Sequence, residues 1–151
     1  MKFSDMIIAT SALALFALIL NAILLVAFAP LSNNTTSEWL STIISYLIVS
    51  LIVGYLFASK IQEESRIRAV LGITVLTSLL AIFFFSIWIA SPFGSPWFKD
   101  SLSSNLNTSG WTDYQWSAYT ALLVSLDVLI SFVLSFIGLY AGSMLKKPKK
   151  T

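Results

Sequence analysis

One acidic side chain lies inside a long apolar segment and is the first residue in this chain that could do chemistry. Asp127 stands in the run Leu123–Ile130, where Ser125 is the only other polar residue. A carboxylate placed inside a membrane-spanning helix costs about 3 kcal/mol on insertion scales, so such residues face the interior of a helix bundle and often handle a proton or a cation. Asp127 is therefore the candidate for ion chemistry.

Asn21, in the first apolar run, is the candidate partner of Asp127. With a rise of 1.5 Å per residue, Asn21 lies roughly 12 Å and Asp127 roughly 14 Å from the outer ends of their predicted helices. A hydrogen bond between them would join the first and last helices and contribute about 1 kcal/mol. This structural role is favoured over an ion site, because no second acid, lysine or arginine that could form a relay lies in the predicted membrane interior, and Arg68 stands at the cytoplasmic end of its run.

Other reactive chemistry is excluded by composition. The chain has neither cysteine nor histidine, so it has no thiolate, disulfide, imidazole ligand or histidine base. It also has no glycine-rich phosphate loop, no paired carboxylates and no nucleophile beside a base. We expect no enzymatic activity, no cofactor and no metal site.

The overall composition is that of a membrane protein. Charged residues make up 11% of the chain and the mean hydropathy is +0.85, whereas soluble domains carry about 25% charged residues. A water-soluble core cannot absorb that much apolar surface. The basic residues that give the net charge of +2 flank the apolar runs, so membrane topology explains them and nucleic-acid binding has no support.

Four segments are long enough to cross a bilayer as helices, at about residues 6–29, 39–59, 67–91 and 118–145. The expected connections are outer loops at about 30–38 and 92–117 and a cytoplasmic turn at about 60–66. The predicted fold class is all-α: a polytopic membrane protein with a bundle of four transmembrane helices, forming a single domain over residues 1–151.

The loop charges predict the orientation. Of nine lysine and arginine residues, eight fall on one side of the predicted membrane: Lys2, Lys60, Arg66, Arg68, Lys146, Lys147, Lys149 and Lys150. Lys99 falls on the other. Because basic residues are retained in the cytoplasm, we expect a multi-pass protein of the plasma membrane with both termini inside.

The outer loops have two further features. Asn33, Asn34 and Asn107 each begin an N-glycosylation acceptor pattern, which would fit an archaeal cell-surface glycoprotein. All five tryptophans also lie at or near this side: Trp39, Trp88, Trp97, Trp111 and Trp116. They either anchor a cap on the lipid headgroups or form a contact surface for a partner, since tryptophan is enriched at binding hot spots.

Small residues recur at helical spacing and predict close helix packing. In the fourth apolar run Ser131, Ser135, Gly138 and Gly142 follow Asp127 on one stripe, and Gly54 begins a similar pattern in the second run.

These patterns favour a non-catalytic accessory subunit of a larger membrane complex, such as a respiratory or monooxygenase assembly, with other membrane subunits and lipid as partners. The alternative is a small proton or cation channel or transporter that acts through Asp127. Four helices rarely enclose a pathway, so this version requires a homo-oligomer. A signalling or adhesion protein ranks third, because the outer loops are too short for a folded ectodomain.

Overall fold

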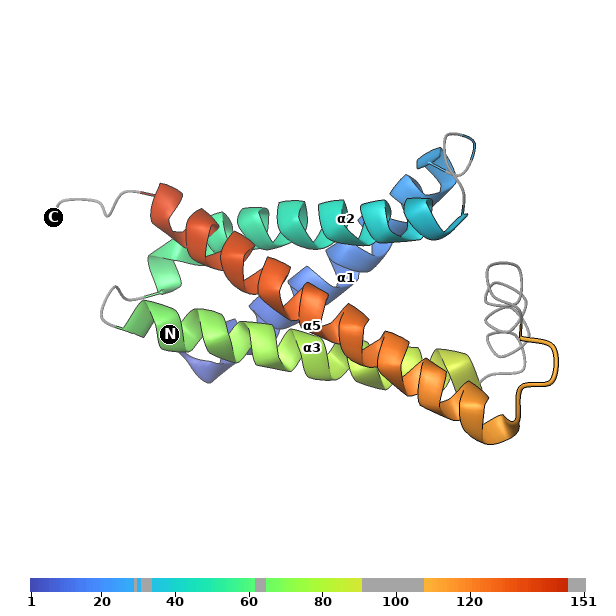
Figure 1. Cartoon of the computed structure of the whole chain (residues 1–151). Helices are drawn as coiled ribbons and strands as arrows, with labels where there is room; N and C mark the ends of the chain where they lie inside the picture. Colours follow the sequence, from blue (N-terminus) through green and yellow to red (C-terminus); the bar gives the residue numbers. More distant parts are fainter. Residues whose placement is uncertain (29, 31–33, 62–64, 91–107, 147–151) are drawn as a thin grey trace, which may run out of the picture. The chain divides into compact units, whose positions relative to one another are not determined.

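The structure is a computed structural model and describes residues 1–28, 30, 34–61, 65–90 and 108–146. Within these ranges it is all-helical (Figure 1). The elements are α1 (Phe3–Phe28), α2 (Asn34–Phe57), the short 3-10 helix η1 (Ala58–Lys60), α3 (Arg66–Ala90) and α5 (Asp113–Leu145). Four of them are long and apolar enough to cross a membrane. The prediction of an all-helical chain with four segments of this kind is confirmed.

Each predicted span overlaps one helix, but the helices extend further at some ends. Helix α2 begins at Asn34, within the segment predicted as the loop 30–38, and α5 begins at Asp113, within the predicted loop 92–117. Apolar runs indicate which residues need lipid, whereas a helix backbone continues through polar residues wherever its end is capped. After α2, the chain turns through η1 before α3 begins at Arg66.

The helices divide into two compact units. Unit 1 holds α1, α2, η1, α3 up to Ser78 and α5 from Ile130 onward. Unit 2 holds the remainder of α3 from Leu79 and α5 up to Leu129.

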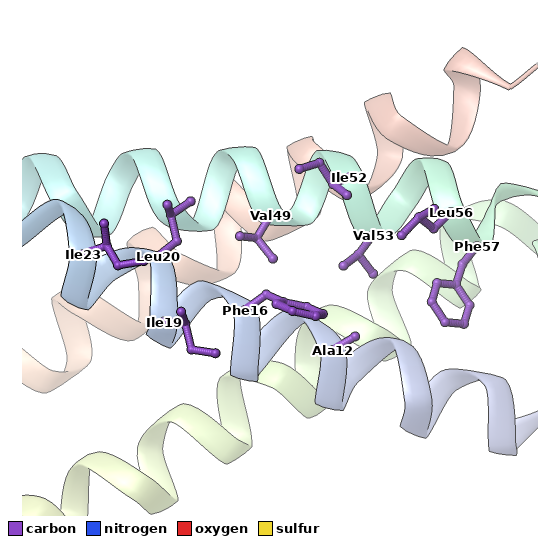
Figure 2. A pocket seen from close by; sticks show the side chains of 10 residues that line it. All are labelled: Ala12, Phe16, Ile19, Leu20, Ile23, Val49, Ile52, Val53, Leu56 and Phe57. Atoms are coloured by element: carbon purple, nitrogen blue, oxygen red, sulfur yellow. The ribbon is translucent and has the colours of Figure 1, made fainter.

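Helices α1 and α2 pack side by side in unit 1. The hydroxyl of Ser37 donates a hydrogen bond of 3.2 Å to the carbonyl oxygen of Phe28, which fixes the start of α2 against the end of α1. An apolar groove of about 390 Å³ lies between the two helices (Figure 2). It is lined by Ala12, Phe16, Ile19, Leu20, Ile23, Val49, Ile52, Val53, Leu56 and Phe57.

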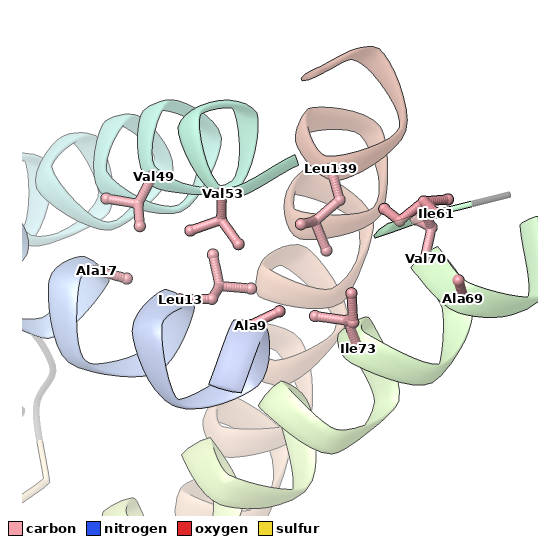
Figure 3. Packing of buried hydrophobic residues seen from close by; sticks show 10 residues of the cluster. All are labelled: Ala9, Leu13, Ala17, Val49, Val53, Ile61, Ala69, Val70, Ile73 and Leu139. Carbon is pink, nitrogen blue, oxygen red and sulfur yellow. The ribbon is translucent and has the colours of Figure 1, made fainter. Parts of the chain in front are cut away.

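The interior of unit 1 mixes apolar and hydroxyl side chains. Figure 3 shows the apolar side chains of this interior. Leu13 of α1, Ile73 of α3 and Leu139 of α5 are fully buried within one apolar cluster. Among the described residues, every buried polar side chain is a serine or a threonine: Thr10, Ser37, Ser41, Ser45, Ser50, Thr74, Thr77, Ser78, Ser131, Ser135 and Ser143. Small hydroxyl residues let membrane helices approach closely, so this interior suits a bundle surrounded by lipid.

Some of these hydroxyls are bonded within their own helix, and Ser50, like Ser37, reaches a neighbouring helix. Thr74 and Thr77 donate to the carbonyl oxygens four residues earlier, at 2.9 and 2.8 Å. Ser50 of α2 lies 3.1 Å from the carbonyl oxygen of Leu47 and 3.4 Å from that of Leu134 in α5. The hydroxyl of Ser50 therefore also helps to join α2 to α5.

Three glycines allow the backbones of α2 and α5 to touch. A Cβ atom on Gly54 would meet the carbonyl oxygen of Leu139 and lie 2.9 Å from its Cα. One on Gly138 would meet the hydroxyl of Ser50, and one on Gly142 would meet the carbonyl oxygen of Leu51. No side chain fits at these positions without displacing its neighbour, so the predicted small-residue packing of these helices is confirmed.

Four segments bring basic residues to one end of unit 1. The Nζ atom of Lys60 lies 4.0 Å from a carboxylate oxygen of Asp5, which links η1 to the start of α1. The Nζ atom of Lys146 lies 5.7 Å from the centre of the Tyr55 ring, which links the end of α5 to α2. The starts of α1 and α3 lie at the same end (Figure 1). We call this the basic end of unit 1 and define it by Lys2, Lys60, Arg66, Arg68 and Lys146.

Candidate functional site

The start of α5 in unit 2 is fixed by a reciprocal pair of caps. The backbone N–H of Thr112 donates to the side-chain oxygen of Gln115 at 2.8 Å, and the backbone N–H of Gln115 lies 3.3 Å from the hydroxyl of Thr112. This is the capping-box arrangement, in which the N-cap residue and the residue three positions later satisfy each other's amides. Gly110 precedes it with φ of 87°, a conformation that glycine adopts without strain.

The caps hold three aromatic rings together, which we call the aromatic cluster: Trp111, Trp116 and Tyr119. The ring centroids of Trp111 and Trp116 are 5.2 Å apart, and those of Trp111 and Tyr119 are 5.4 Å apart at 71°. Tilted and edge-to-face contacts of this kind are the favourable arrangements for aromatic rings. Tyr114, on the same helical turn, is 82% exposed. The cluster is a preformed aromatic surface beside an open tyrosine.

The structure brings together two of the five tryptophans that were predicted to face a partner, Trp111 and Trp116. Trp39 lies half-buried near the start of α2, in unit 1. Trp97 and the side chain of Trp88 lie outside the described residues. Tyr119 joins the cluster although the sequence analysis did not single it out. Its spacing of three residues from Trp116 on a helix was the available signal.

The predicted glycosylation sites fall largely outside the described residues. Asn33 and Asn107 are not described, and Asn34 is the first residue of α2 with its side chain also outside the description. Their modification stays a prediction.

Asp127 and Asn21 lie in different units. Asp127 is half-buried on α5 in unit 2, and Asn21 is half-buried on α1 in unit 1. The hydrogen bond predicted between them stays a prediction. Asp127 continues the stripe of α5 on which Ser131, Ser135 and the two glycines are buried in unit 1.

Several buried polar atoms of unit 1 have no hydrogen-bond partner among the described residues. They include the side-chain oxygens of Thr10, Asn21, Ser45, Ser131 and Ser135. A serine or threonine hydroxyl in a helix can rotate toward the carbonyl oxygen three or four residues earlier. The four hydroxyl positions are therefore compatible with helix packing and do not by themselves form a binding site, whereas the oxygen of Asn21 is an acceptor and needs a donor.

The groove between α1 and α2 was not anticipated from the sequence. Its lining consists entirely of apolar side chains, and Phe16, Ile19, Ile23, Ile52 and Leu56 are each substantially exposed at its edges. Figure 2 shows that side chains of both helices point into the space between them. The small-residue stripe of Thr10 and Ala17 marks the buried face of α1, but apolar residues recur on all its other faces, so apolar periodicity does not indicate which of them lines a groove.

The described parts of the chain contain no group of three or more acidic, histidine or cysteine side chains that could hold a metal ion. No family model matches the chain, and comparison with curated proteins and with solved structures gives no match either.

Proposed function

We propose that the chain is a non-catalytic accessory subunit of a larger integral membrane complex and that it binds a neighbouring subunit through the aromatic cluster of α5. The observation that supports this is the preformed packing of Trp111, Trp116 and Tyr119 beside the exposed ring of Tyr114. Tryptophan and tyrosine supply large contact areas and dominate the binding energy of many protein interfaces. A cluster fixed by helix caps loses little conformational entropy when it binds.

The length of α5 supports an exposed position for the cluster. Helix α5 has 33 residues, which at 1.5 Å per residue is about 50 Å. The hydrocarbon core is about 30 Å thick, so some 13 residues of a helix perpendicular to the bilayer would extend beyond it. With Lys146 at one surface, these residues form the start of the helix, where the cluster lies.

The proposed orientation places the cluster outside the cell. The basic end of unit 1 would lie in the cytoplasm of a plasma-membrane protein, with both termini inside, because lysine and arginine are retained there. The start of α5 would then face the exterior, and the partner subunit would contact the chain at or above the outer headgroups.

Purification from native membranes tests the proposal. Tagged wild-type protein in a mild detergent is expected to co-purify with defined partner subunits. In the double variant Trp111→Ala, Trp116→Ala, the amount of co-purified partner is expected to fall at least tenfold, because hot-spot tryptophans contribute about 2 kcal/mol or more to binding. The matched control is Phe83→Ala, Phe84→Ala, which removes a ring pair of unit 2 that lies outside the aromatic cluster, with centroids 5.8 Å apart. Wild-type protein that comes out alone, or a tryptophan variant that keeps its partners, would reject the proposal.

A proton or cation function through Asp127 is the second candidate. The observation in its favour is that Asp127 precedes the buried Ser131 and Ser135 on one stripe of α5, so a carboxyl and two hydroxyls follow one another along the helix. Ion flux into proteoliposomes should then fall when Asp127→Asn replaces the wild type. Equal flux for the two proteins, or no flux for either, would remove this candidate.

A further inference from the structure

We propose that the groove between α1 and α2 binds one acyl chain of an anionic phospholipid, whose headgroup lies against Lys60 and Lys2 at the basic end of unit 1. This inference goes beyond the proposed function and does not depend on it, because the groove and the aromatic cluster share no residue.

The groove accepts only an apolar ligand. All ten lining side chains are aliphatic or phenylalanine. A buried polar group without a hydrogen-bond partner is unfavourable, so a polar solute is excluded from this space. Ile19 and Ile52 are 44% and 49% exposed at the edges of the groove, so the groove is open along its side and a hydrocarbon chain can enter laterally from the membrane.

The dimensions fit one acyl chain better than a protein helix. From Ala12 to Ile23 the α1 side of the groove extends for about 16 Å, and from Val49 to Phe57 the α2 side extends for about 12 Å. One leaflet of the hydrocarbon core is about 15 Å thick. The groove volume of about 390 Å³ spread over that length gives a cross-section of about 25 Å², roughly a third of that of an α-helix 10 Å in diameter.

Positive charge lies at one end of the groove. Figure 2 shows Ala12 and Phe57 at one end and Leu20 and Ile23 at the other. Phe57 directly precedes η1, which ends at Lys60. The side chain of Lys60 is 59% exposed, and its contact with Asp5 is a long one at 4.0 Å, so N–H groups remain available for a phosphate.

Lys2 adds a second exposed positive charge at the start of α1. The two positive charges of Lys2 and Lys60 outnumber the single negative charge of Asp5, which is paired with Lys60. Juxtamembrane basic residues attract anionic lipids. The apolar groove therefore suits the acyl chain of a phospholipid, and the two lysines suit its anionic headgroup.

Native mass spectrometry of the full chain in detergent tests the inference with phosphatidylglycerol and phosphatidylcholine of identical acyl chains. Wild-type protein is expected to bind phosphatidylglycerol at least about fivefold more strongly than phosphatidylcholine, and Lys60→Gln should reduce this preference about fivefold. Lys60→Arg is the charge control and should keep the preference, because arginine retains a positive charge at the end of η1 beside Asp5.

Groove filling tests the acyl-chain site separately. Ile19→Trp and Ile52→Trp should each abolish tight binding of one lipid, whereas Leu18→Trp should not, because Leu18 is 65% exposed and does not line the groove. Helix content and thermal unfolding of each variant show whether the protein is folded, and a folded variant at either groove position is sufficient.

Three results would overturn the inference. The first is equal binding of the two phospholipids by wild-type protein. The second is unchanged phosphatidylglycerol binding in a folded groove-filled variant. The third is a second polypeptide captured in native membranes by a photo-crosslinking amino acid in place of Ile19, which would assign the groove to a partner helix. Failure of the accessory-subunit proposal, in contrast, appears in the purification of wild-type protein and of the tryptophan variant, and not in lipid binding.

Discussion

At the scale of single residues, close packing in unit 1 depends on glycines, because they have no Cβ atom. At Gly54 and Gly142 the neighbouring atoms belong to the backbone of the facing helix, which cannot rotate away. At Gly72 the added Cβ would meet the terminal methyl of Met6, the far end of a flexible side chain. The same residue type therefore has different consequences at the two kinds of position.

Substitution by alanine should distinguish the glycines that face a backbone from the glycine that faces a flexible side chain. Gly54→Ala and Gly142→Ala are each expected to lower the free energy of unfolding by about 1–3 kcal/mol, because overpacking forces α2 and α5 apart. Gly72→Ala should leave it unchanged or raise it by up to about 1 kcal/mol, since alanine favours a helix over glycine. Unfolding in detergent with increasing dodecyl sulfate measures all three. Equal losses at the three sites would contradict the packing described for α2 and α5.

Ser50 and Gly138 should be energetically coupled. A Cβ on Gly138 would meet the hydroxyl of Ser50 and also lie 3.0 Å from the carbonyl oxygen of Leu47. Ser50→Ala alone should cost about 0.6 kcal/mol, the usual value for a hydrogen bond between membrane helices. In that background Gly138→Ala should be less destabilising by about 1 kcal/mol, but not neutral, because the contact with Leu47 remains. A double-mutant cycle of unfolding free energies measures the coupling, and strict additivity would refute it.

At the scale of elements, the sequence predicts the helices well and their ends less well. Long apolar runs identify α1, α2, α3 and α5 because backbone amides in lipid must be satisfied within a helix. The start of α5 was missed by five residues, although Thr112 and Gln115 have the spacing of a capping box. Apolar periodicity could not reveal the groove, because apolar residues recur on every face of α1 outside its small-residue stripe and only its tilt against α2 decides which side chains remain uncovered.

The caps of α5 should control the order of the aromatic cluster. Thr112→Ala and Gln115→Ala are each expected to destabilise the first turn by about 1 kcal/mol, which raises hydrogen exchange of the bonded amides of Gln115 and Trp116 about fivefold. Thr112→Ser and Gln115→Glu retain the hydrogen-bonding groups and serve as controls. Exchange that is the same in the alanine variants and in the wild type would show that the cluster is held by other contacts.

At the scale of the whole molecule, the sequence predicts topology from charge and the structure adds the packing within unit 1. Basic residues far apart in the chain, such as Lys60 and Lys146, come to one end through Asp5 and Tyr55. The tryptophans were all expected on one outer surface, and the structure brings two of them together with Tyr119. Which rings touch depends on the local turn at Thr112, and loop composition alone cannot determine such a contact.

Cysteine labelling should establish the orientation directly. The chain has no cysteine, so all maleimide labelling of a single-cysteine variant comes from the introduced residue. In intact cells Ser109→Cys is expected to react with a membrane-impermeant maleimide, and Ser4→Cys only after permeabilisation, because the basic end lies in the cytoplasm in the proposed topology. Cysteine-free wild type is the control. The reverse pattern of labelling would show that the topology is inverted and that the aromatic cluster lies inside the cell.

The length of α5 also determines how deeply its acid is immersed. Asp127 lies on α5 and precedes Lys146, the residue that follows the end of this helix, by 19 positions, a distance of about 28 Å. That distance is close to the full thickness of the hydrocarbon core. With Lys146 at one surface and α5 perpendicular to it, the carboxylate therefore reaches the opposite headgroup region, where water is near and a charge costs far less than at the bilayer centre. Asp127 is then better suited to hold the outer end of the helix at the water boundary than to carry ions through the membrane.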